Sequence, residues 1–257
     1  MKIEEMLNKV ICADCLEFMK DIPDKSIDMI LCDLPYGTTA CKWDTIIPFE
    51  PLWEQYKRII KDNGAIVLTA NNPFASRLVC SNLEMYRYEW IWDKVRGYNF
   101  QQANFAPMKN HEQVLVFSKL PAIYNKRGTM NYFPQKTNTD IKHKSGTPTK
   151  TDNLRDGAST LLKPLNIEHE GFFPLSIQKF PKEKKSLHPT QKPVALFEYL
   201  IKTYTNEGDL VLDNCAGSGT TGVACKNLNR NYILIEKEPE YIKIAEARLQ
   251  ALPNTLF

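Results

Sequence analysis

Residues 209–222 read Asp-Leu-Val-Leu-Asp-Asn-Cys-Ala-Gly-Ser-Gly-Thr-Thr-Gly. The apolar residues before Asp213 predict a buried strand, and Gly217, Gly219 and Gly222 satisfy the pattern G-x-G-x-x-G where this strand turns into a helix. Glycine permits a tight turn and lets the backbone approach a nucleotide closely. The stretch therefore predicts an α/β fold with a loop for a nucleoside-containing cofactor. The loop alone does not decide which cofactor, because dinucleotide-binding dehydrogenases use the same pattern.

Strands and helices are predicted to alternate on both sides of this loop, which indicates a parallel sheet. Upstream, the pattern predicts strands at 10–12, 27–32 and 65–69, helices beginning at Asp14, Glu50 and Pro73, and an antiparallel pair at 88–92 and 112–117. The helix from Glu50 is expected to end near Gly64. Downstream, we expect helices at 193–205, 220–229 and 239–251 and strands at 209–213 and 232–235.

The middle of the chain lacks this alternation. Residues 119–187 contain thirteen Lys or Arg and six Asp or Glu, a local charge of +7, so the remainder of the chain carries −4 of the net +3. A basic segment on a mildly acidic body is typical of a protein that binds a polyanion, although a solvated loop has the same composition. We therefore divide the chain into 1–118, 119–187 and 188–257. The candidate phosphate contacts in the middle segment are Lys142, Lys144, Lys184 and Lys185.

Asp33-Leu34-Pro35-Tyr36 follows the apolar run at 27–32. It should lie at the carboxyl end of a parallel strand, where open α/β sheets bind ligands. Asp33 offers a carboxylate, Leu34 offers a main-chain carbonyl, and Pro35 restricts the turn. Two acceptors and the flat ring of Tyr36 suit an exocyclic amino group on a planar heterocycle. This tetrapeptide is the candidate catalytic turn.

Two further positions suit a nucleoside-containing cofactor and a carboxylate. Glu236 ends the predicted strand after the glycine loop, where a carboxylate can accept hydrogen bonds from a ribose diol. The run His188-Pro-Thr190-Gln-Lys192-Pro193 precedes a predicted helix. Thr190 and Lys192 near a helix N-terminus favour a bound carboxylate.

Taken together, DLPYG, HPTQKP and DNCAGSGTTG, with Glu236, resemble the β group of amino-methylating DNA methyltransferases, in that group's permuted order. The resemblance implies a Rossmann-like, circularly permuted fold with a seven-stranded, mostly parallel sheet, an antiparallel last strand, and an inserted target-recognition segment at 119–187. It implies S-adenosylmethionine as cofactor and double-stranded DNA as partner. A homodimer and a cognate restriction endonuclease stay open. Asp33, the Leu34 carbonyl, Pro35 and Tyr36 would hold a flipped base. The implied cofactor residues are Asp14, Cys15, His188, Thr190, Lys192, Asp213, Cys215, Gly217, Gly219 and Glu236.

The resemblance favours adenine N6 over cytosine N4, because the cytosine enzymes usually begin the tetrapeptide with Ser where this chain has Asp33. Family members usually have Pro at the position of Leu34, and Leu supplies the same carbonyl with less rigidity. Methylation of RNA, methylation of protein glutamine (which usually goes with Asn at this position) and a catalytically inactive DNA binder are the more distant alternatives. No Pro-Cys dipeptide is present, which argues against the cysteine-dependent methylation of a ring carbon.

Composition bounds the remaining expectations. The seven cysteines are an odd number and are scattered, which favours reduced thiols and a cytoplasmic protein. Cys12 and Cys15 form an isolated C-x-x-C without a second pair, so we expect no metal. The sequence has neither a signal peptide pattern nor an apolar stretch of about 18 residues, so we expect no membrane span.

Overall fold

The computed structural model describes residues 2–38, 44–123, 126, 128–144, 168–183 and 191–252. They divide into a main unit, formed by residues up to 133 and from 176 onward, and a smaller unit at 134–175. In the main unit the strands are β1 (Lys9–Cys12), β2 (Ile27–Cys32), β3 (Ile60–Ala70), β4 (Tyr86–Tyr98), β5 (Lys109–Phe117), β8 (Ile177–Lys179), β9 (Leu210–Asp213) and β10 (Asn231–Glu236). The helices are α1 (Cys15–Met19), α2 (Phe49–Ile59), α3 (Phe74–Ser81), α4 (Val194–Tyr204), α5 (Thr220–Asn227) and α6 (Pro239–Gln250).

Eight of the described strands form one sheet in the order β1-β10-β9-β2-β3-β5-β4-β8. From β1 to β3 all neighbours are parallel, whereas β5 is antiparallel to both β3 and β4. The resemblance implied seven strands and an antiparallel last strand. The last strand of the chain, β10, is instead parallel to both neighbours, and the antiparallel strand is β5. The additional strand is β8, which pairs with β4 at the edge of the sheet.

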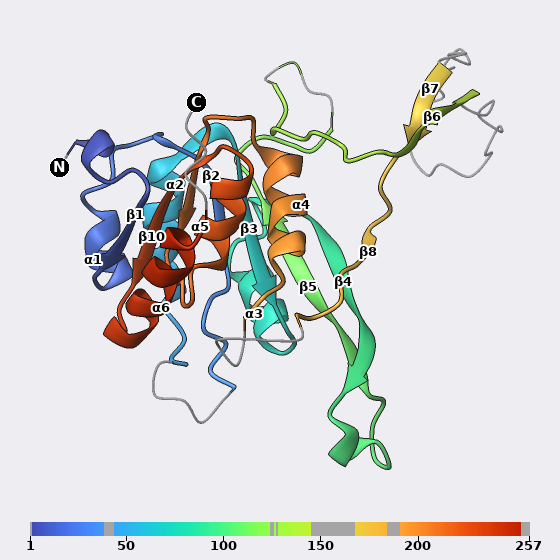
Figure 1. The fold of residues 1–257 in the computed structure, drawn as a ribbon, viewed down its shortest axis with the longest axis horizontal. Coiled ribbons are helices and arrows are strands. Elements are labelled where there is room, and N and C mark those ends of the chain that lie inside the picture. The colour runs from blue at the N-terminus through green and yellow to red at the C-terminus, as the bar shows by residue number, and fades with distance from the viewer. Residues whose placement is uncertain are drawn as a thin grey trace. The chain divides into compact units, whose positions relative to one another are not determined.

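Helices cover both faces of the sheet (Figure 1). Because side chains alternate along a strand, Ile30 and Cys32 of β2 pack with α1, α2 and α3, while Met29 and Leu31 pack with α4, α5 and α6. Every residue of β2 is buried. A strand buried on both faces is expected at the centre of a parallel sheet, and its carboxyl end carries the catalytic turn.

Local sequence predicted most elements to within a few residues, but not the end of α2. This helix ends at Ile59, and β3 begins at Ile60. Gly64 is therefore not a helix cap. A Cβ at Gly64 would lie 2.7 Å from the carbonyl oxygen of Asp28, so glycine lets β3 pack closely against β2.

The smaller unit contains β6 (Thr137–Lys144) and β7 (Glu168–Phe172), which pair antiparallel. It is narrower than the predicted recognition segment, 119–187. Met130, upstream of it, is buried in the core of the main unit. The assignment of 119–187 to target recognition stays a prediction.

Candidate active site

Asp33 is the centre of a hydrogen-bonded cluster at the carboxyl end of β2. Its Oδ1 accepts a hydrogen bond of 2.7 Å from the Tyr36 hydroxyl and a second from the Thr69 hydroxyl. Its Oδ2 accepts a hydrogen bond of 2.5 Å from the Lys192 ammonium. Thr69 lies beside Asp33 because β3 is parallel to β2, with Cys32 opposite Leu68. These donors hold the carboxylate in one orientation.

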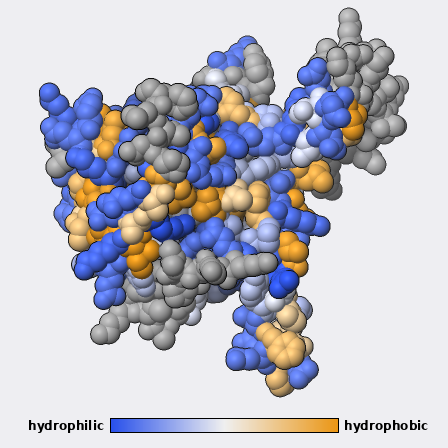
Figure 2. All heavy atoms as spheres, viewed as in Figure 1, coloured by the Kyte–Doolittle hydropathy of each residue, from blue (hydrophilic) through white to orange (hydrophobic). Residues whose placement is uncertain are grey.

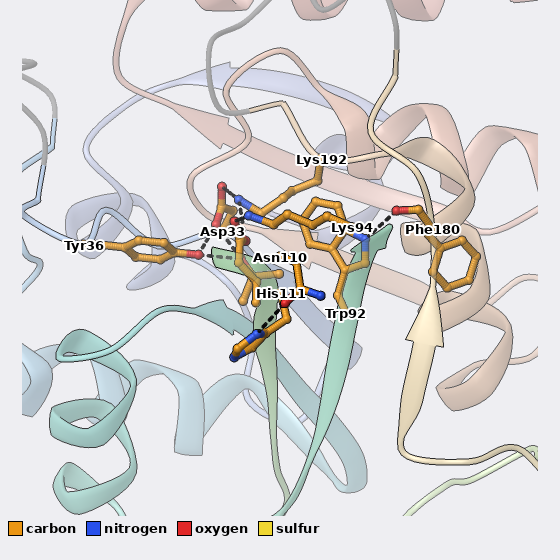
Figure 3. Close-up of polar contacts among 10 residues, drawn as sticks. Asp33, Tyr36, Trp92, Lys94, Asn110, His111, Phe180 and Lys192 are labelled. Atoms are coloured by element: carbon orange, nitrogen blue, oxygen red, sulfur yellow. Dashed lines mark hydrogen bonds and ion pairs between the residues drawn. The ribbon is translucent and has the colours of Figure 1, made fainter. Parts of the chain in front are cut away.

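Lys192 belongs to a chain of four charges beside the catalytic turn (Figure 3). Its Nζ lies 2.5 Å from Asp33 Oδ2 and 3.5 Å from Glu112 Oε2. The other oxygen of Glu112 forms an ion pair with Lys94. The side chains of Lys94, Glu112 and Lys192 are each less than a tenth exposed. Buried charges are tolerated when they are paired, and here two carboxylates alternate with two ammonium groups.

The pairing shifts the pKa values of the buried members. Burial disfavours the charged form of Lys192, but Asp33 and Glu112 outweigh it and raise the pKa of the ammonium. Burial likewise opposes ionisation of Glu112, but Lys192 and Lys94 outweigh it and lower the pKa of this carboxyl group. Lys192 and Glu112 are therefore charged at neutral pH.

The Tyr36 ring is fixed by its surroundings. Its hydroxyl bonds to Asp33, and the ring stacks on Phe74 with centroids 5.1 Å apart and an interplanar angle of 28°. Burial, followed by the charge of Asp33, raises the pKa of the hydroxyl well above its usual value. The hydroxyl therefore stays protonated and donates to Asp33.

The glycine loop joins β9 to α5. Gly219 has a φ of +77°, and a Cβ there would lie 2.8 Å from the Ala245 Cβ, so both its conformation and its packing favour glycine. Gly217 has a φ of +50° with open space beside it. Asp213, just before the loop, accepts hydrogen bonds from the Cys215 amide and the Thr221 hydroxyl. Burial raises the pKa of Asp213 to about 7.

Glu236 connects the loop to the neighbouring strand end. It accepts hydrogen bonds of 2.8 Å from the Gly217 amide and 2.9 Å from the Glu238 amide. The parallel pairing of β1 with β10 sets Cys12 opposite Glu236, so Asp14 and Cys15 follow at the same edge. Asp14 caps α1 by accepting hydrogen bonds from the Leu16 and Glu17 amides.

Two cavities meet at Asp33 and Lys192, which line both. The first lies at the carboxyl ends of β1, β10, β9 and β2. Its lining includes Asp14, Cys15, Asp213, Cys215, Gly217 and Glu236. The lining of the second cavity includes Leu34, Tyr36, Asn71, Trp92, Glu112 and Lys182.

The structure brings together most site residues that the sequence predicted. Pro35 lines the first cavity, and Gly219 is the N-cap residue of α5. His188, Thr190, Lys184 and Lys185 lie outside the described residues. Lys142 and Lys144 lie in β6, where only the backbone is described. The contact of Lys192 with Asp33 was not predicted, and its role toward the cofactor carboxylate stays a prediction.

Sequence reasoning missed Thr69, Trp92, Lys94 and Glu112. Thr69, Trp92 and Glu112 lie on predicted strands, and Lys94 lies two residues beyond one of them, because β4 continues to Tyr98. Only strand pairing brings these residues beside the Asp33 turn. Glu112 and Trp92 are opposite each other on β5 and β4. The available signal was charge inside an apolar strand, because Glu112 lies two residues before the buried run that begins at Val114.

The first cavity fits the cofactor that the resemblance implies. Glu236 offers a carboxylate for a ribose diol, and the open space beside Gly217 leaves the loop accessible to a ligand. Lys192 also lines this cavity, beside Asp33. Among the residues described, no cluster of His, Cys, Asp or Glu could hold a metal ion, and no helix is long and apolar enough to cross a membrane.

Comparison with known proteins identifies the family. The N6_N4_Mtase family, a family of DNA methylases, matches residues 27–247, which contain the catalytic turn, the glycine loop and Glu236. The chain belongs to this family. Membership confirms the predicted class of N6/N4 DNA methyltransferases with S-adenosylmethionine as cofactor.

Individual relatives cover nearly the whole chain. The type II methyltransferase M.HpaI of Haemophilus parainfluenzae is 30% identical over 259 residues, which cover 96% of this chain and 75% of the relative. The type II methyltransferase M1.MboII of Moraxella bovis is 30% identical over 268 residues, which cover 96% of this chain and 98% of the relative.

Solved structures share the fold. The complex of M1.HpyAVI with SAM matches with a TM-score of 0.59 and 27% identity, covering 94% of this chain and 99% of that one. The cytosine-N4-specific PvuII DNA methyltransferase matches with a TM-score of 0.65, covering 97% of this chain and 88% of that one. At 16% identity this second likeness concerns the fold alone.

Glu236→Ala is expected to raise the KM for the methyl donor. Each charge-assisted hydrogen bond to a ribose hydroxyl contributes about 1.5–3 kcal/mol, so the KM should rise by at least about tenfold. Affinity for DNA should change less, because Glu236 lines the first cavity and not the second. Steady-state kinetics at varied cofactor and varied DNA concentration measures both effects. Glu240→Ala, an exposed carboxylate in α6, is the matched control. An unchanged KM in Glu236→Ala would place this residue outside the cofactor site.

Proposed function

We propose that this methyltransferase acts on the N6 amino group of adenine, within a specific sequence of double-stranded DNA, after the base has left the helix. The observation that carries the proposal is the position of Asp33. Its carboxylate lies where the first cavity, proposed to hold the cofactor, meets the second cavity. The second cavity is lined by Leu34 and by the aromatic ring of Tyr36. The amino group of a base bound in the second cavity would then point toward a methyl donor bound in the first.

The hydrogen bonds of Asp33 indicate which oxygen receives the amino group. A carboxylate has about four lone-pair sites. Tyr36 and Thr69 use two sites on Oδ1, and Lys192 uses one on Oδ2. The remaining site on Oδ2 is available for one amino hydrogen, and in this proposal the Leu34 carbonyl accepts the other.

Two acceptors on the same amino group address the chemical difficulty of the reaction. The nitrogen lone pair of adenine N6 is delocalised into the ring, so the free amine is a poor nucleophile. Acceptors on both hydrogens increase electron density on the nitrogen and direct its lone pair toward the cofactor cavity, which is catalysis by orientation and electrostatics. When bound, S-adenosylmethionine supplies an electrophilic methyl group on a sulfonium. The chain needs to supply no nucleophile of its own.

The second cavity has the features that a flipped base requires. Enzymes that modify a base extrude it from the duplex and stack it against aromatic side chains. Tyr36 and Trp92 line this cavity. Trp92 is held in place by a 2.7 Å hydrogen bond from its Nε1 to the Phe180 carbonyl. A base entering between these walls would present its amino group to Asp33.

Cytosine N4 is the alternative target, because the same two acceptors would hold its amino group. Asp at position 33, where the resemblance associates Ser with cytosine enzymes, favours adenine.

The test is to express the protein in cells that lack DNA methylation and to digest their DNA to nucleosides. Mass spectrometry should then detect N6-methyladenine. Detection of N4-methylcytosine instead would contradict the choice of base. If the DNA contains no modified nucleoside and a filter assay shows transfer to RNA, DNA as the substrate is contradicted. Modification mapping of the same DNA gives the sequence context.

We also propose that residues 119–187 select the target sequence and contribute phosphate contacts. Exchanging this segment for that of a relative should change the methylated sequence while transfer still depends on Asp33. Replacing Lys142 and Lys144, or Lys184 and Lys185, should lower the affinity for all DNA sequences to the same extent, because phosphate contacts carry no sequence information. The slope of log affinity against log salt should flatten by about 0.9 per lost contact. Continued modification of the original sequence after the exchange would locate recognition elsewhere, and the 37–48 loop would be tested next.

A further inference from the structure

The hairpin between β4 and β5 projects from the main unit on the side of the active site (Figure 1). β3 is parallel to β2, β5 is antiparallel to β3, and β4 is antiparallel to β5. β4 therefore runs in the same direction as β2, and the hairpin tip lies beyond the edge at which β2 delivers Asp33.

Strand register gives the reach of this hairpin. Cys32 lies level with Leu68, which pairs with Leu115. The last pair of the hairpin joins Tyr98 to Lys109. Six residues of β5 separate Lys109 from Leu115, and at about 3.4 Å per residue the tip begins about 20 Å beyond the end of β2. Midway along this path, Trp92 and Glu112 form a wall of the second cavity, so this wall continues into the hairpin.

The hairpin tip, residues 95–108, combines exposed apolar side chains with polar neighbours, as Figure 2 shows on its visible face. Phe100 is 80% exposed and Phe105 is 90% exposed. Val95 and Met108 are also exposed. Soluble proteins expose single apolar residues commonly, but a cluster of them marks an interaction site.

The composition of the tip and its flanks specifies a nucleic-acid partner. Residues 95–111 contain Arg96 and Lys109 but no Asp or Glu, and they contain five amide side chains, at 99, 101, 102, 104 and 110. Basic side chains suit phosphates, and Asn and Gln suit base edges. A protein partner that buried two phenylalanines would not require this excess of basic and amide groups.

The tip is built to hold its shape. Gln102 accepts backbone hydrogen bonds from Phe105 and Ala106, and the Gln102 amide bonds to the Asn99 carbonyl. Gly97 packs against Met108 so closely that a Cβ would lie 2.8 Å from the Met108 Cε. Phe100 and Phe105 are therefore presented on an ordered turn.

We infer that the tip of the β4–β5 hairpin enters the duplex beside the flipped base, and that Phe100 and Phe105 occupy the space that the base leaves. Apolar wedges such as Phe are used by DNA-binding proteins to separate base steps. Filling the gap stabilises the open duplex and so holds the base in the second cavity. This inference rests on the proposed methylation of a flipped DNA base.

The test compares paired and weakened duplexes. Wild type, Phe100→Ala, Phe105→Ala and the double variant are assayed on a duplex with the mapped target base paired, and on the same duplex with the target opposite an abasic site. Opening a base without a partner costs less. We expect the double variant to lose at least about tenfold in kcat/KM on the paired duplex. The loss should shrink to less than about threefold opposite the abasic site.

Two controls separate this result from misfolding and from association of the protein. Leu83→Ala removes an apolar side chain that is 65% exposed and precedes β4, at the opposite end of the strand from the tip. It should behave like wild type, and all variants should bind S-adenosylmethionine with unchanged affinity in calorimetry. 2-Aminopurine at the target should brighten on binding wild type and not on binding the double variant.

Three outcomes would overturn the inference. They are wild-type activity of the double variant on the paired duplex, an equal loss on both duplexes, and a changed oligomeric state in sedimentation without an effect on DNA. The second would mean contact without insertion, and the third a contact between copies of the protein. Failure of wild type itself to methylate either duplex would instead contradict the proposed function.

Discussion

Asp33→Ala is expected to abolish methyl transfer, with kcat reduced by at least about 10³-fold. The substitution removes the carboxylate that we propose accepts an amino hydrogen, and it leaves Lys192 without its 2.5 Å partner. Affinity for S-adenosylmethionine should stay within about tenfold of wild type, or about 1.4 kcal/mol, because the carboxylate mainly serves the base. Radiolabel transfer and isothermal titration calorimetry measure the two quantities separately.

A surface carboxylate provides the control for this result. Asp62 forms exposed ion pairs with Lys25 and Lys119, so Asp62→Ala should transfer methyl groups at the wild-type rate. Loss of cofactor binding in Asp33→Ala would show that Asp33 acts chiefly in the cofactor cavity. Near-normal transfer would remove Asp33 from the mechanism altogether.

Lys192→Met is expected to reduce both kcat and stability. The ammonium lies between Asp33 and Glu112, so its removal leaves two carboxylates facing each other. Removing one partner of a buried ion pair typically costs about 3–5 kcal/mol of unfolding free energy. With Asp33 no longer held at Oδ2, kcat should fall by about 10²-fold. Denaturant unfolding at pH 7 and single-turnover kinetics give the two numbers.

The pH profile distinguishes a role in positioning Asp33 from loss of structure. In Lys192→Met the two carboxylates repel, which raises their pKa values, so the acid side of the pH–rate profile should move to higher pH. In wild type the pKa of Lys192 is raised, so its contribution to the free energy of unfolding is fully present below about pH 10.5. This contribution is lost as the pH rises through the folded-state pKa. The lowered pKa of Glu112 acts at the other extreme, because its contribution is present above about 4.5 and is lost as pH falls through the folded-state pKa.

Glu112→Gln provides a graded comparison for the same network. It keeps the shape of the side chain and leaves Lys192 paired with Asp33, so kcat should fall by only about tenfold. An unshifted pH profile in Lys192→Met, together with equal kcat losses in Lys192→Met and Glu112→Gln, would indicate that the network acts through stability alone.

The sequence by itself determined the parts of this protein that depend on neighbouring residues. The strand at 27–32 and the turn that begins at Asp33 follow from a buried apolar run and a proline. The glycine loop follows from the spacing of Gly217 and Gly219, whose positive φ angles L side chains avoid. Steric and hydrogen-bonding preferences of this kind act over a few residues, so they can be read along the chain.

Only the tertiary structure decided which distant side chains meet. Lys192 contacts Asp33 across 159 residues of sequence, and Glu112 reaches Lys192 through the antiparallel pairing of β5. Gly64 suggested a helix end, but the carbonyl of Asp28 on the neighbouring strand made it a packing position. Alternation along a strand predicts which residues are buried. Strand order and register decide which of them are neighbours, and those arise from the packing of the whole sheet between its two layers of helices.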